Sequence, residues 1–287
     1  IHPFEKQIRC LVGSAEYGDR RLNREKIEDS PGHQMNGQEY GIFLAGAYFK
    51  YKKYLAPDGS IYVILDDFRL DDGSMSCYLE YFVTEMLKNG FYLVGRYIWV
   101  KDNPMPRSYR DKDMVGGYEM IYRFSLDPEK YYCNTDLFLE RERGKNESFR
   151  EGCTNSDKKG NTSRGGEYYQ SHLKKLRNTL DERKCMDIIQ GNVCNPETFF
   201  LQEEQKKHSS QSPIYLTSTL ILESTQPGDL VVDIWNGVGN TMTSALLLGR
   251  KYVGIELNKN FYEQTCRRIQ LTEEMLKGTE NRLPSAA

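Results

Sequence analysis

The sequence predicts an α/β fold with a twisted, mostly parallel sheet that carries helices on both faces. Two observations lead to this prediction. Helix-type and strand-type patterns alternate along residues 1–135 and again along residues 212–271, as they do where helices connect parallel strands. A glycine-rich loop at residues 233–241 also joins a strand to a helix, an arrangement typical of nucleotide-binding α/β units.

The first half of the chain contains three expected strands and two expected helices. Apolar residues at helical spacing stop at Pro57 and Gly59, because both residue types oppose helix continuation. Runs of β-branched and aromatic residues indicate the strands. In chain order we expect a strand at Gln7–Gly13, a helix at Tyr40–Leu55, a strand at Ser60–Asp66, a helix at Cys77–Lys88 and a strand at Phe91–Val100.

The last part of the chain repeats this alternation. Pro213 suits the first turn of a helix, where its missing N–H group is not needed. We expect, in order, a helix at Pro213–Ser224, a strand at Leu230–Asp233, a helix that ends at Leu248, a strand at Lys251–Ile255, a helix from Lys259 and a polar tail after Lys277.

Composition excludes several classes of protein. The 287 residues include 20 Tyr and 12 Phe, which predicts an aromatic-rich core. The seven Cys have irregular spacing and no C-x-x-C pair, which excludes a disulfide scaffold or a recognisable zinc site. They fit a reducing compartment and so predict a cytoplasmic protein. The four His lack the spacing of metal ligands. The best uncharged apolar run, Gly41–Phe49, is far shorter than the ~20 residues of a membrane helix, so we expect no membrane partner.

The middle of the chain differs from both flanking parts. Residues 141–185 contain twelve Lys and Arg against seven Asp and Glu, a local charge of +5 in a chain of net charge −2. A solvated loop and a basic insert that approaches phosphates both fit this composition. On charge alone the solvated loop is favoured.

A group of residues after the strand that ends at Asp233 indicates a nucleotide-like ligand. Gly237 and Gly239 allow close approach of the backbone, and a helix follows. Glu256, 23 residues after Asp233, ends the next strand, where a carboxylate can accept hydrogen bonds from ribose hydroxyls. No Lys-Ser or Lys-Thr pair follows the glycines, which excludes a P-loop and favours an adenosine ligand without phosphates.

These residues resemble the amino-methylating DNA methyltransferases, in the permuted order in which the catalytic motif precedes the cofactor motif. The family loop usually reads Asp-Pro-Phe-x-Gly-Ser-Gly-Thr-Thr, and here Ile234, Trp235 and Asn240 depart from it. The segment Gly249–Asn258 and the helix around Arg267 are similar to the family pattern. The resemblance covers nearly the whole chain except residues 140–205, where the family inserts its variable target-recognition region.

The resemblance implies a Rossmann-like methyltransferase fold that binds S-adenosylmethionine, acts on double-stranded DNA by base flipping and belongs to a restriction–modification setting. It divides the chain into a catalytic half (1–139), a target-recognition insert (140–205), a cofactor-binding half (206–277) and a polar tail (278–287). The implied cofactor-binding residues are Asp233, Trp235, Asn236, Gly237, Gly239, Thr241, Glu256, Leu257 and Asn258. The implied DNA-binding residues are Lys101, Asn103 and Pro104, similar to the stretch near the target base, and Lys174, Lys175 and Arg177 of the insert.

The catalytic motif is altered. The family has Ser, Asp or Asn followed by Pro-Pro-Tyr, and this chain has Ser14, Ala15, Glu16 and Tyr17. The resemblance implies that Ser14 accepts a hydrogen bond from the exocyclic amine, the Ala15 carbonyl takes the other amine proton, and Tyr17 stacks on the flipped base. The rigidity of the two prolines is lost, and Glu16 places a carboxylate where the family has an apolar ring.

Three further residues are weaker candidates. His208 lies roughly where the family approaches the methionine end of the cofactor, but the match is loose. Asp66 and Asp67 form a carboxylate pair at a strand end, which we interpret as solvated rather than catalytic.

The sequence therefore favours a site-specific DNA methyltransferase, with cytosine N4 preferred over adenine N6 because of Ser14. One alternative is a catalytically silent relative that binds DNA, cofactor or a partner without methylating. Another is a methyltransferase for RNA or a small molecule, which the basic insert disfavours. The sequence leaves the oligomeric state open, and a homodimer is one of the states that it allows.

Overall fold

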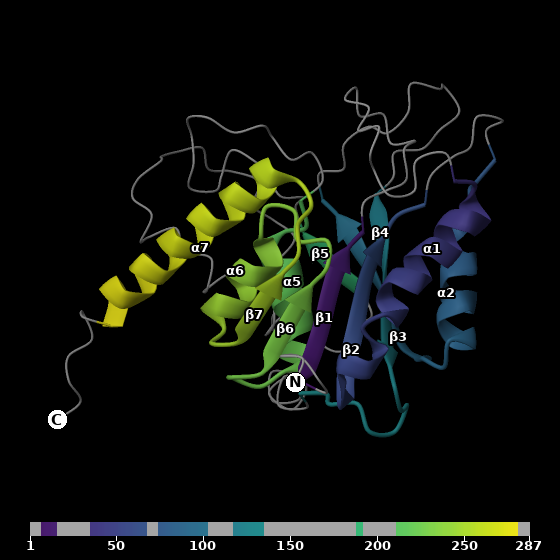
Figure 1. The fold of residues 1–287 in the computed structure, drawn as a ribbon, viewed down its shortest axis with the longest axis horizontal. Coiled ribbons are helices and arrows are strands. Elements are labelled where there is room, and N and C mark those ends of the chain that lie inside the picture. The colour runs from purple at the N-terminus through teal and green to yellow at the C-terminus, as the bar shows by residue number, and fades with distance from the viewer. Residues whose placement is uncertain are drawn as a thin grey trace, which may run out of the picture.

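A computed structural model of the chain describes residues 7–15, 35–67, 74–102, 117–134, 188–191 and 211–280. Within these residues seven strands form one sheet in the order β5-β3-β4-β2-β1-β6-β7 (Figure 1). The strands are β1 (Ile8–Ser14), β2 (Leu55–Leu65), β3 (Tyr92–Lys101), β4 (Tyr118–Ser125), β5 (Ile188–Gly191), β6 (Leu230–Asp233) and β7 (Lys251–Gly254). The helices are α1 (Gly37–Phe49), a 3₁₀ turn (Lys52–Tyr54), α2 (Tyr78–Lys88), α5 (Ile214–Ser224), α6 (Asn240–Leu247) and α7 (Lys259–Glu280).

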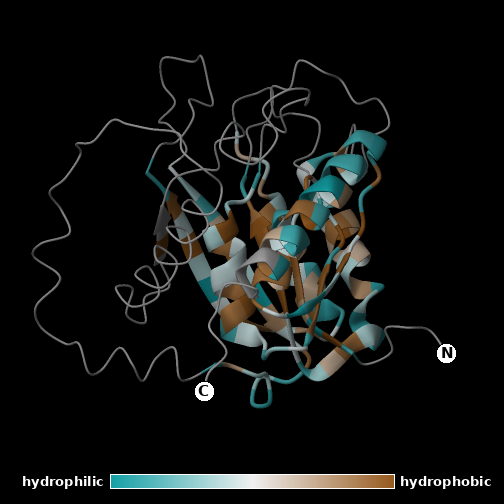
Figure 2. Ribbon diagram, turned by 90° about the vertical axis from the view of Figure 1, so that its left-hand side faces the viewer, coloured by the Kyte–Doolittle hydropathy of each residue, from teal (hydrophilic) through white to brown (hydrophobic). Residues whose placement is uncertain are grey.

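The sheet is mixed but mostly parallel, which confirms the predicted fold class. β4 alone runs antiparallel to its neighbours, β2 and β3, while all other strand pairs are parallel. The sequence did not predict β4, the one antiparallel strand among those described. Figure 2 shows the central strands coloured mainly as hydrophobic and the outer turns of the helices mainly as hydrophilic.

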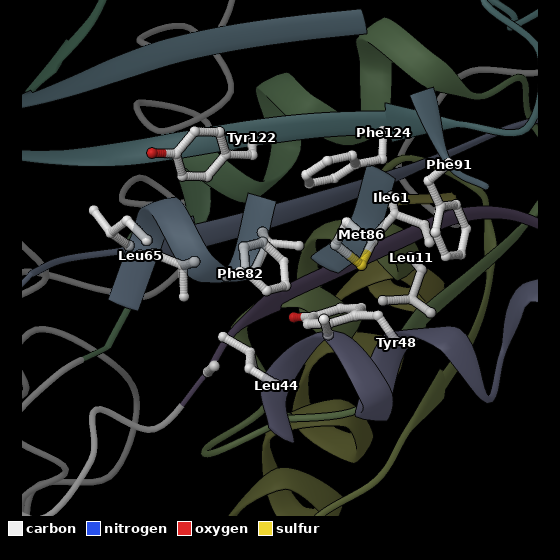
Figure 3. Close-up of a cluster of buried hydrophobic side chains, with 14 of the residues drawn as sticks. Leu11, Leu44, Tyr48, Ile61, Leu65, Phe82, Met86, Phe91, Tyr122 and Phe124 are labelled. Carbon is white, nitrogen blue, oxygen red and sulfur yellow. The ribbon is translucent and has the colours of Figure 1, made fainter. Parts of the chain in front are cut away.

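The two faces of the sheet are covered by different helices, as the period-2 alternation of a strand requires. On one face, Leu11 of β1 and Ile61 of β2 pack with α1 and α2, around Phe82 and Phe124 (Figure 3). On the other face, Val12 and its neighbours pack against α5 and α6. Burial on both faces explains why these strands read as nearly continuous apolar runs.

The first predicted helix is wrong at both ends. α1 begins at Gly37 because Asn36 caps it: the Asn36 side chain accepts from the Glu39 N–H at 2.9 Å, and the Glu39 carboxylate accepts from the Asn36 N–H at 2.9 Å. It ends at Phe49, before a 3₁₀ turn, and β2 already starts at Leu55. The Pro-Gly segment therefore lies within β2, as an irregularity in its pairing with β1, rather than as a turn before the strand.

Residues of the predicted insert also take part in the sheet. β5, at residues 188–191, pairs in parallel with the edge strand β3, from Ile188 opposite Ile98 to Gly191 opposite Lys101. Four residues are too short for a periodic pattern to reveal, so sequence reasoning did not predict this strand.

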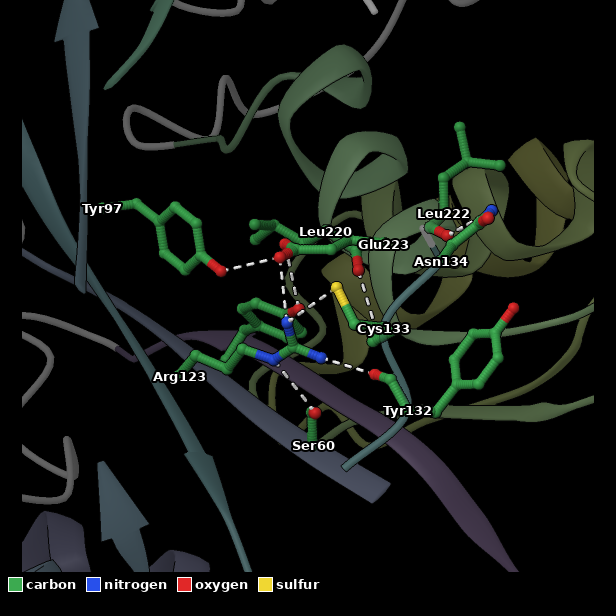
Figure 4. Close-up of polar contacts among 11 residues, drawn as sticks. Ser60, Tyr97, Arg123, Tyr132, Cys133, Asn134, Leu220, Leu222 and Glu223 are labelled. Atoms are coloured by element: carbon green, nitrogen blue, oxygen red, sulfur yellow. Dashed lines mark hydrogen bonds and ion pairs between the residues drawn. The ribbon is translucent and has the colours of Figure 1, made fainter. Parts of the chain in front are cut away.

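A buried ion pair fixes the segment after β4 to helix α5 (Figure 4). Arg123 donates to Glu223 Oε1 at 2.9 Å and to the Tyr132 carbonyl at 2.7 Å. Glu223 also accepts hydrogen bonds from the hydroxyls of Tyr62 at 3.1 Å and Tyr97 at 2.7 Å. Because both charges have several partners, the desolvation of this buried pair is compensated and the segment has a defined position.

Candidate cofactor and active site

The described residues of the predicted catalytic and cofactor motifs gather at one edge of the sheet. β1, β6 and β7 are adjacent and parallel, with Leu11 opposite Val232 and Asp233 opposite Gly254. Their carboxyl ends therefore place Ser14, Asp233 and the segment around Glu256 at the same edge. Ligands of open α/β sheets bind at this kind of edge.

The glycine-rich loop needs its glycines. Gly237 and Gly239 have φ angles of 54° and 84°, in the left-handed region that favours glycine. A side chain on Gly239 would also lie 2.7 Å from Cγ2 of Thr265 in α7. Both glycines are therefore required by backbone geometry, and Gly239 places the start of α6 directly beside the loop.

Glu256 is held by this loop. Its Oε2 accepts a hydrogen bond from the Gly237 N–H at 2.7 Å, and its Oε1 accepts one from the Asn258 N–H at 2.8 Å. Asn258 in turn caps α7 through a hydrogen bond from the Asn260 N–H at 2.9 Å. The neighbouring Leu257 is 82% exposed, so its apolar side chain is available to a ligand at this edge.

Asp233 is a buried carboxyl at the end of β6. Its Oδ1 accepts from the Trp235 N–H at 2.8 Å, and Thr241 adds a side-chain hydrogen bond. Burial raises the pKa of Asp233 to about 7, and the charge of Glu256 contributes in the same direction, while the hydrogen bonds oppose the shift. A buried carboxyl with a pKa near neutrality is typical of a functional site.

Two asparagines connect the loop to its surroundings. Asn236 donates to the Thr265 hydroxyl at 3.1 Å, and its backbone N–H donates to the Ile255 carbonyl at 3.0 Å. Asn240, which departs from the family pattern, donates to the Ser212 carbonyl at 2.7 Å and accepts from Arg268. The departure at Asn240 is therefore explained locally, because its side chain joins α6, α7 and the segment before α5.

The catalytic motif is described only in part. Ser14 is the last residue of β1, opposite Ile64 of β2, and its side chain is partly exposed. Ala15 follows and is buried. Glu16 and Tyr17 lie outside the described residues, so their predicted roles remain predictions.

Lys101 differs from the expectation of a DNA contact. Its side chain is 8% exposed, its Nζ lies 2.6 Å from Glu119 Oε1, and a second carboxylate, Asp66, is 3.8 Å away. The ammonium group is therefore held in a buried ion pair. The expectation that Asp66 is solvated is wrong, because Asp66 is buried beside Lys101. The other predicted DNA-binding residues lie outside the described part of the chain: Asn103, Pro104, Lys174, Lys175 and Arg177.

Sequence reasoning missed two residues at this site, Gly13 and Tyr48. A side chain on Gly13 would lie 3.0 Å from the Tyr48 hydroxyl and 3.1 Å from Cδ1 of Trp235. The absence of a side chain thus lets α1 and the cofactor loop meet at the end of β1. Tyr48 lies among apolar residues at helical spacing, so the sequence pattern marks it only as a core residue.

Neither a metal cluster nor a membrane-spanning helix occurs among the described residues. No group of three or more of their His, Cys, Asp or Glu side chains is arranged to hold a metal ion. None of the helices in the same part of the chain combines the length and apolar character that a membrane crossing requires.

Known proteins with similar sequences are DNA methyltransferases. The profile of the N6/N4 DNA methylase family matches residues 3–267. The DNA adenine methyltransferase YhdJ of Escherichia coli (strain K12) is 36% identical over 84 residues, 29% of each chain. The type II methyltransferase M2.MboI of Moraxella bovis is 41% identical over 76 residues, 26% of this chain and 28% of that protein. These alignments span less than a third of either relative.

Solved structures share the fold over most of the chain. The PvuII cytosine-N4-specific DNA methyltransferase aligns with a TM-score of 0.61 and 19% identity, covering 92% of this chain and 80% of that one. The complex of M1.HpyAVI with S-adenosylmethionine aligns with a TM-score of 0.54 and 16% identity, covering 92% and 89%. The family match over residues 3–267, together with this fold, establishes that the chain belongs to the S-adenosylmethionine-dependent DNA methylases of the N6/N4 family.

Proposed function

We propose that this chain transfers a methyl group from S-adenosylmethionine to the exocyclic amine of a flipped base in double-stranded DNA, with cytosine N4 preferred over adenine N6. The observation that carries the proposal is the position of Ser14 at the end of β1, beside the strand that carries Asp233 and the glycine loop. This arrangement brings a candidate amine acceptor and a candidate cofactor loop to one edge of the sheet. Ser14 also supports the preference for cytosine N4.

The residues of the cofactor loop fit an adenosine ligand with a charged amino-acid end. Gly237 and Gly239 keep the backbone open, and Glu256 is oriented by two N–H groups with its remaining lone pairs suited to ribose hydroxyls. The buried carboxyl of Asp233 suits a cationic group, which would favour its ionised form. When bound, the cofactor supplies a methyl group already activated on a sulfonium.

On the base side, the chain contributes position rather than chemistry. The Ser14 hydroxyl and the Ala15 carbonyl would accept the two amine protons and so direct the nitrogen lone pair toward the methyl group. Tyr17 would stack on the extruded base. The insert, including Lys174, Lys175 and Arg177, would contact phosphates, so that DNA affinity falls steeply with salt concentration.

The direct test is transfer of tritium from labelled S-adenosylmethionine to mixed-sequence DNA, with the Ser14→Ala variant as control. We expect transfer by the wild type, a large loss in the variant and N4-methylcytosine in the nucleoside digest. N6-methyladenine in the digest would reverse the base preference alone. Label that appears in RNA but not in DNA would overturn the proposed substrate.

A silent relative is the second candidate, because Ala15 and Glu16 replace the two prolines of the family motif. Such a protein would bind cofactor and DNA without transferring label.

A restriction–modification setting is supported by the type II methyltransferase names of two relatives, from Moraxella bovis and Streptococcus pneumoniae.

A further inference from the structure

Two buried polar groups meet beside the cofactor loop without a hydrogen bond. The hydroxyl of Tyr48 and the indole N–H of Trp235 are both buried, and neither has a hydrogen-bond partner among the described residues. Buried groups of this kind are rarely left unpaired in native proteins. Tyr48 comes from α1 and Trp235 from the loop after β6, so the two groups belong to opposite halves of the site.

Gly13 brings the two groups together. The position that a side chain on Gly13 would take lies 3.0 Å from the Tyr48 hydroxyl oxygen and 3.1 Å from Trp235 Cδ1, the carbon bonded to the indole nitrogen. The same position lies 3.4 Å from Oδ1 of Asp233. An indole donor, a hydroxyl and a carboxyl oxygen therefore surround one small volume at the end of β1.

The chemistry of these three groups is complementary. An indole N–H only donates, a carboxylate only accepts, and a hydroxyl between them can accept from the first and donate to the second. The Asp233 charge raises the pKa of the Tyr48 hydroxyl in addition to the larger effect of burial, whereas the Trp235 indole lowers it, as a nearby donor does. The distances around Gly13 place the hydroxyl of Tyr48 next to Asp233 and Trp235.

We propose that Tyr48 is a positioning residue of the cofactor site, whose hydroxyl accepts a hydrogen bond from Trp235 and donates one to Asp233 when the cofactor is bound. This inference rests on the proposed function. A cationic ligand at the loop favours ionised Asp233, which orients the Tyr48 O–H toward it and leaves the oxygen lone pair for the indole. These two hydrogen bonds then hold the indole ring of Trp235 against β1.

The chain contains a matched control for this pair. Of its two tryptophans, Trp99 already donates its indole N–H to the Tyr215 hydroxyl at 2.7 Å, between β3 and α5. This is the same chemistry away from the cofactor loop. Tyr215→Phe therefore removes a tyrosine hydroxyl that is paired with tryptophan but has no role in the cofactor site.

The test measures S-adenosylmethionine binding by calorimetry in a double-mutant cycle of Tyr48→Phe and Trp235→Phe. We expect Tyr48→Phe to weaken binding about five-fold to ten-fold, the size of one ordinary hydrogen bond. In the Trp235→Phe background the same change should have a clearly smaller effect, because the donor is already absent. Tyr215→Phe should leave the affinity unchanged.

Two further readouts separate positioning from general stability. Without cofactor, Tyr48→Phe removes an unpaired buried hydroxyl, so its thermal unfolding midpoint should equal or exceed that of the wild type. In a Trp99→Phe background, Trp235 is the single fluorophore of its kind, and its emission should shift on cofactor binding only when Tyr48 is present.

The outcomes for Tyr48 and for the proposed function are distinguishable. Unchanged affinity in Tyr48→Phe, or equal losses with Trp235 present and absent, would overturn the proposed hydrogen-bonded chain while cofactor binding stands. No binding by the wild type would overturn the proposed function, and the role of Tyr48 with it.

Discussion

The carboxylate of Glu256 and the backbone N–H of Gly237 are joined by a hydrogen bond of 2.7 Å, across 19 residues of sequence. The second oxygen of Glu256 accepts from the Asn258 N–H. The acidic residue that the sequence marks as a ribose acceptor therefore also holds the glycine loop in the absence of ligand. The site is in this respect preorganised, which reduces the ordering needed when a ligand binds.

Glu256→Ala should weaken S-adenosylmethionine binding by about 1.5–3 kcal/mol, the value of hydrogen bonds to a charged group. Glu273→Ala is a suitable control, because Glu273 is a carboxylate of α7 whose partner is Tyr252 rather than the loop. Calorimetry on both variants checks the prediction. Equal affinities in Glu256→Ala and wild type would remove the ribose assignment.

Asp233 should make stability depend on pH in the cofactor-free protein. Its native pKa of about 7 lies above the value of about 4 in the unfolded chain, so between these pH values the native state binds more protons. Below about pH 4 the carboxyl is protonated in both states, and the protein keeps the full stability that goes with this protonated form. The free energy of unfolding then falls as the pH rises through about 7, because the buried carboxyl loses its proton.

Asp233→Asn removes this titration while keeping the size of the side chain. The difference in free energy of unfolding between variant and wild type should therefore move in favour of the variant as the pH rises from about 4 to about 8. Denaturant titrations at several pH values measure it. A difference that stays constant with pH would mean that Asp233 keeps an ordinary pKa.

Lys101→Met should act on stability more than on DNA contacts. Its ammonium group is buried against Glu119, so removing it takes the cation away from a buried carboxylate and should lower the free energy of unfolding by about 3–5 kcal/mol. Lys88→Met is the matched control, because the Lys88 pair with Glu85 is exposed and should contribute less than about 1 kcal/mol.

Adding Glu119→Gln to Lys101→Met should recover part of the lost stability, because the second change removes the buried negative charge. A contrary outcome is a stable Lys101→Met variant whose DNA affinity is less sensitive to salt. That result would support the phosphate contact that the sequence predicted for Lys101.

The parts of the site that the sequence predicted are those that depend on neighbours in sequence. Asp233 ends one strand, Gly237 and Gly239 follow it, and the backbone requirements of the two glycines are local. The sequence did not indicate the pair of Lys101 and Glu119, because it depends on the antiparallel placement of β4 beside β3. Sequence reasoning also missed that Tyr48 lies beside the cofactor loop, because the two are far apart along the chain.

The ends of α1 and β2 depend on side-chain and backbone details that the spacing of apolar residues does not predict. The start of α1 is fixed by the reciprocal hydrogen bonds of Asn36 and Glu39, not by the first apolar residue. The pairing of β2 with β1 starts at Leu55, before Pro57, because the register shift accommodates the Pro-Gly segment. Local composition predicted a break there but not that both sides of the break belong to one strand.

The segment from Ser14 to Tyr17 gives the prediction that separates an enzyme from a silent relative. Ala15 follows Ser14 directly and is buried, so the position of its carbonyl depends on local backbone geometry that prolines would fix. Replacing Ala15 and Glu16 by proline restores the rigid turn of the family and removes a charge next to the base site.

If the chain is a methyltransferase impaired only at this turn, the double variant should transfer more tritium to DNA than the wild type, because the amine acceptors become preorganised. The single variant Glu16→Pro tests the loss of the charge together with one proline, without adding atoms at the buried position 15, where extra volume can lower stability by about 1–3 kcal/mol. Unfolding midpoints of both variants identify that effect.

High activity of the wild type would mean that the prolines are dispensable here. If wild type and variants all bind cofactor and DNA yet none transfers label, the silent relative is the correct interpretation, since restoring the turn then restores nothing.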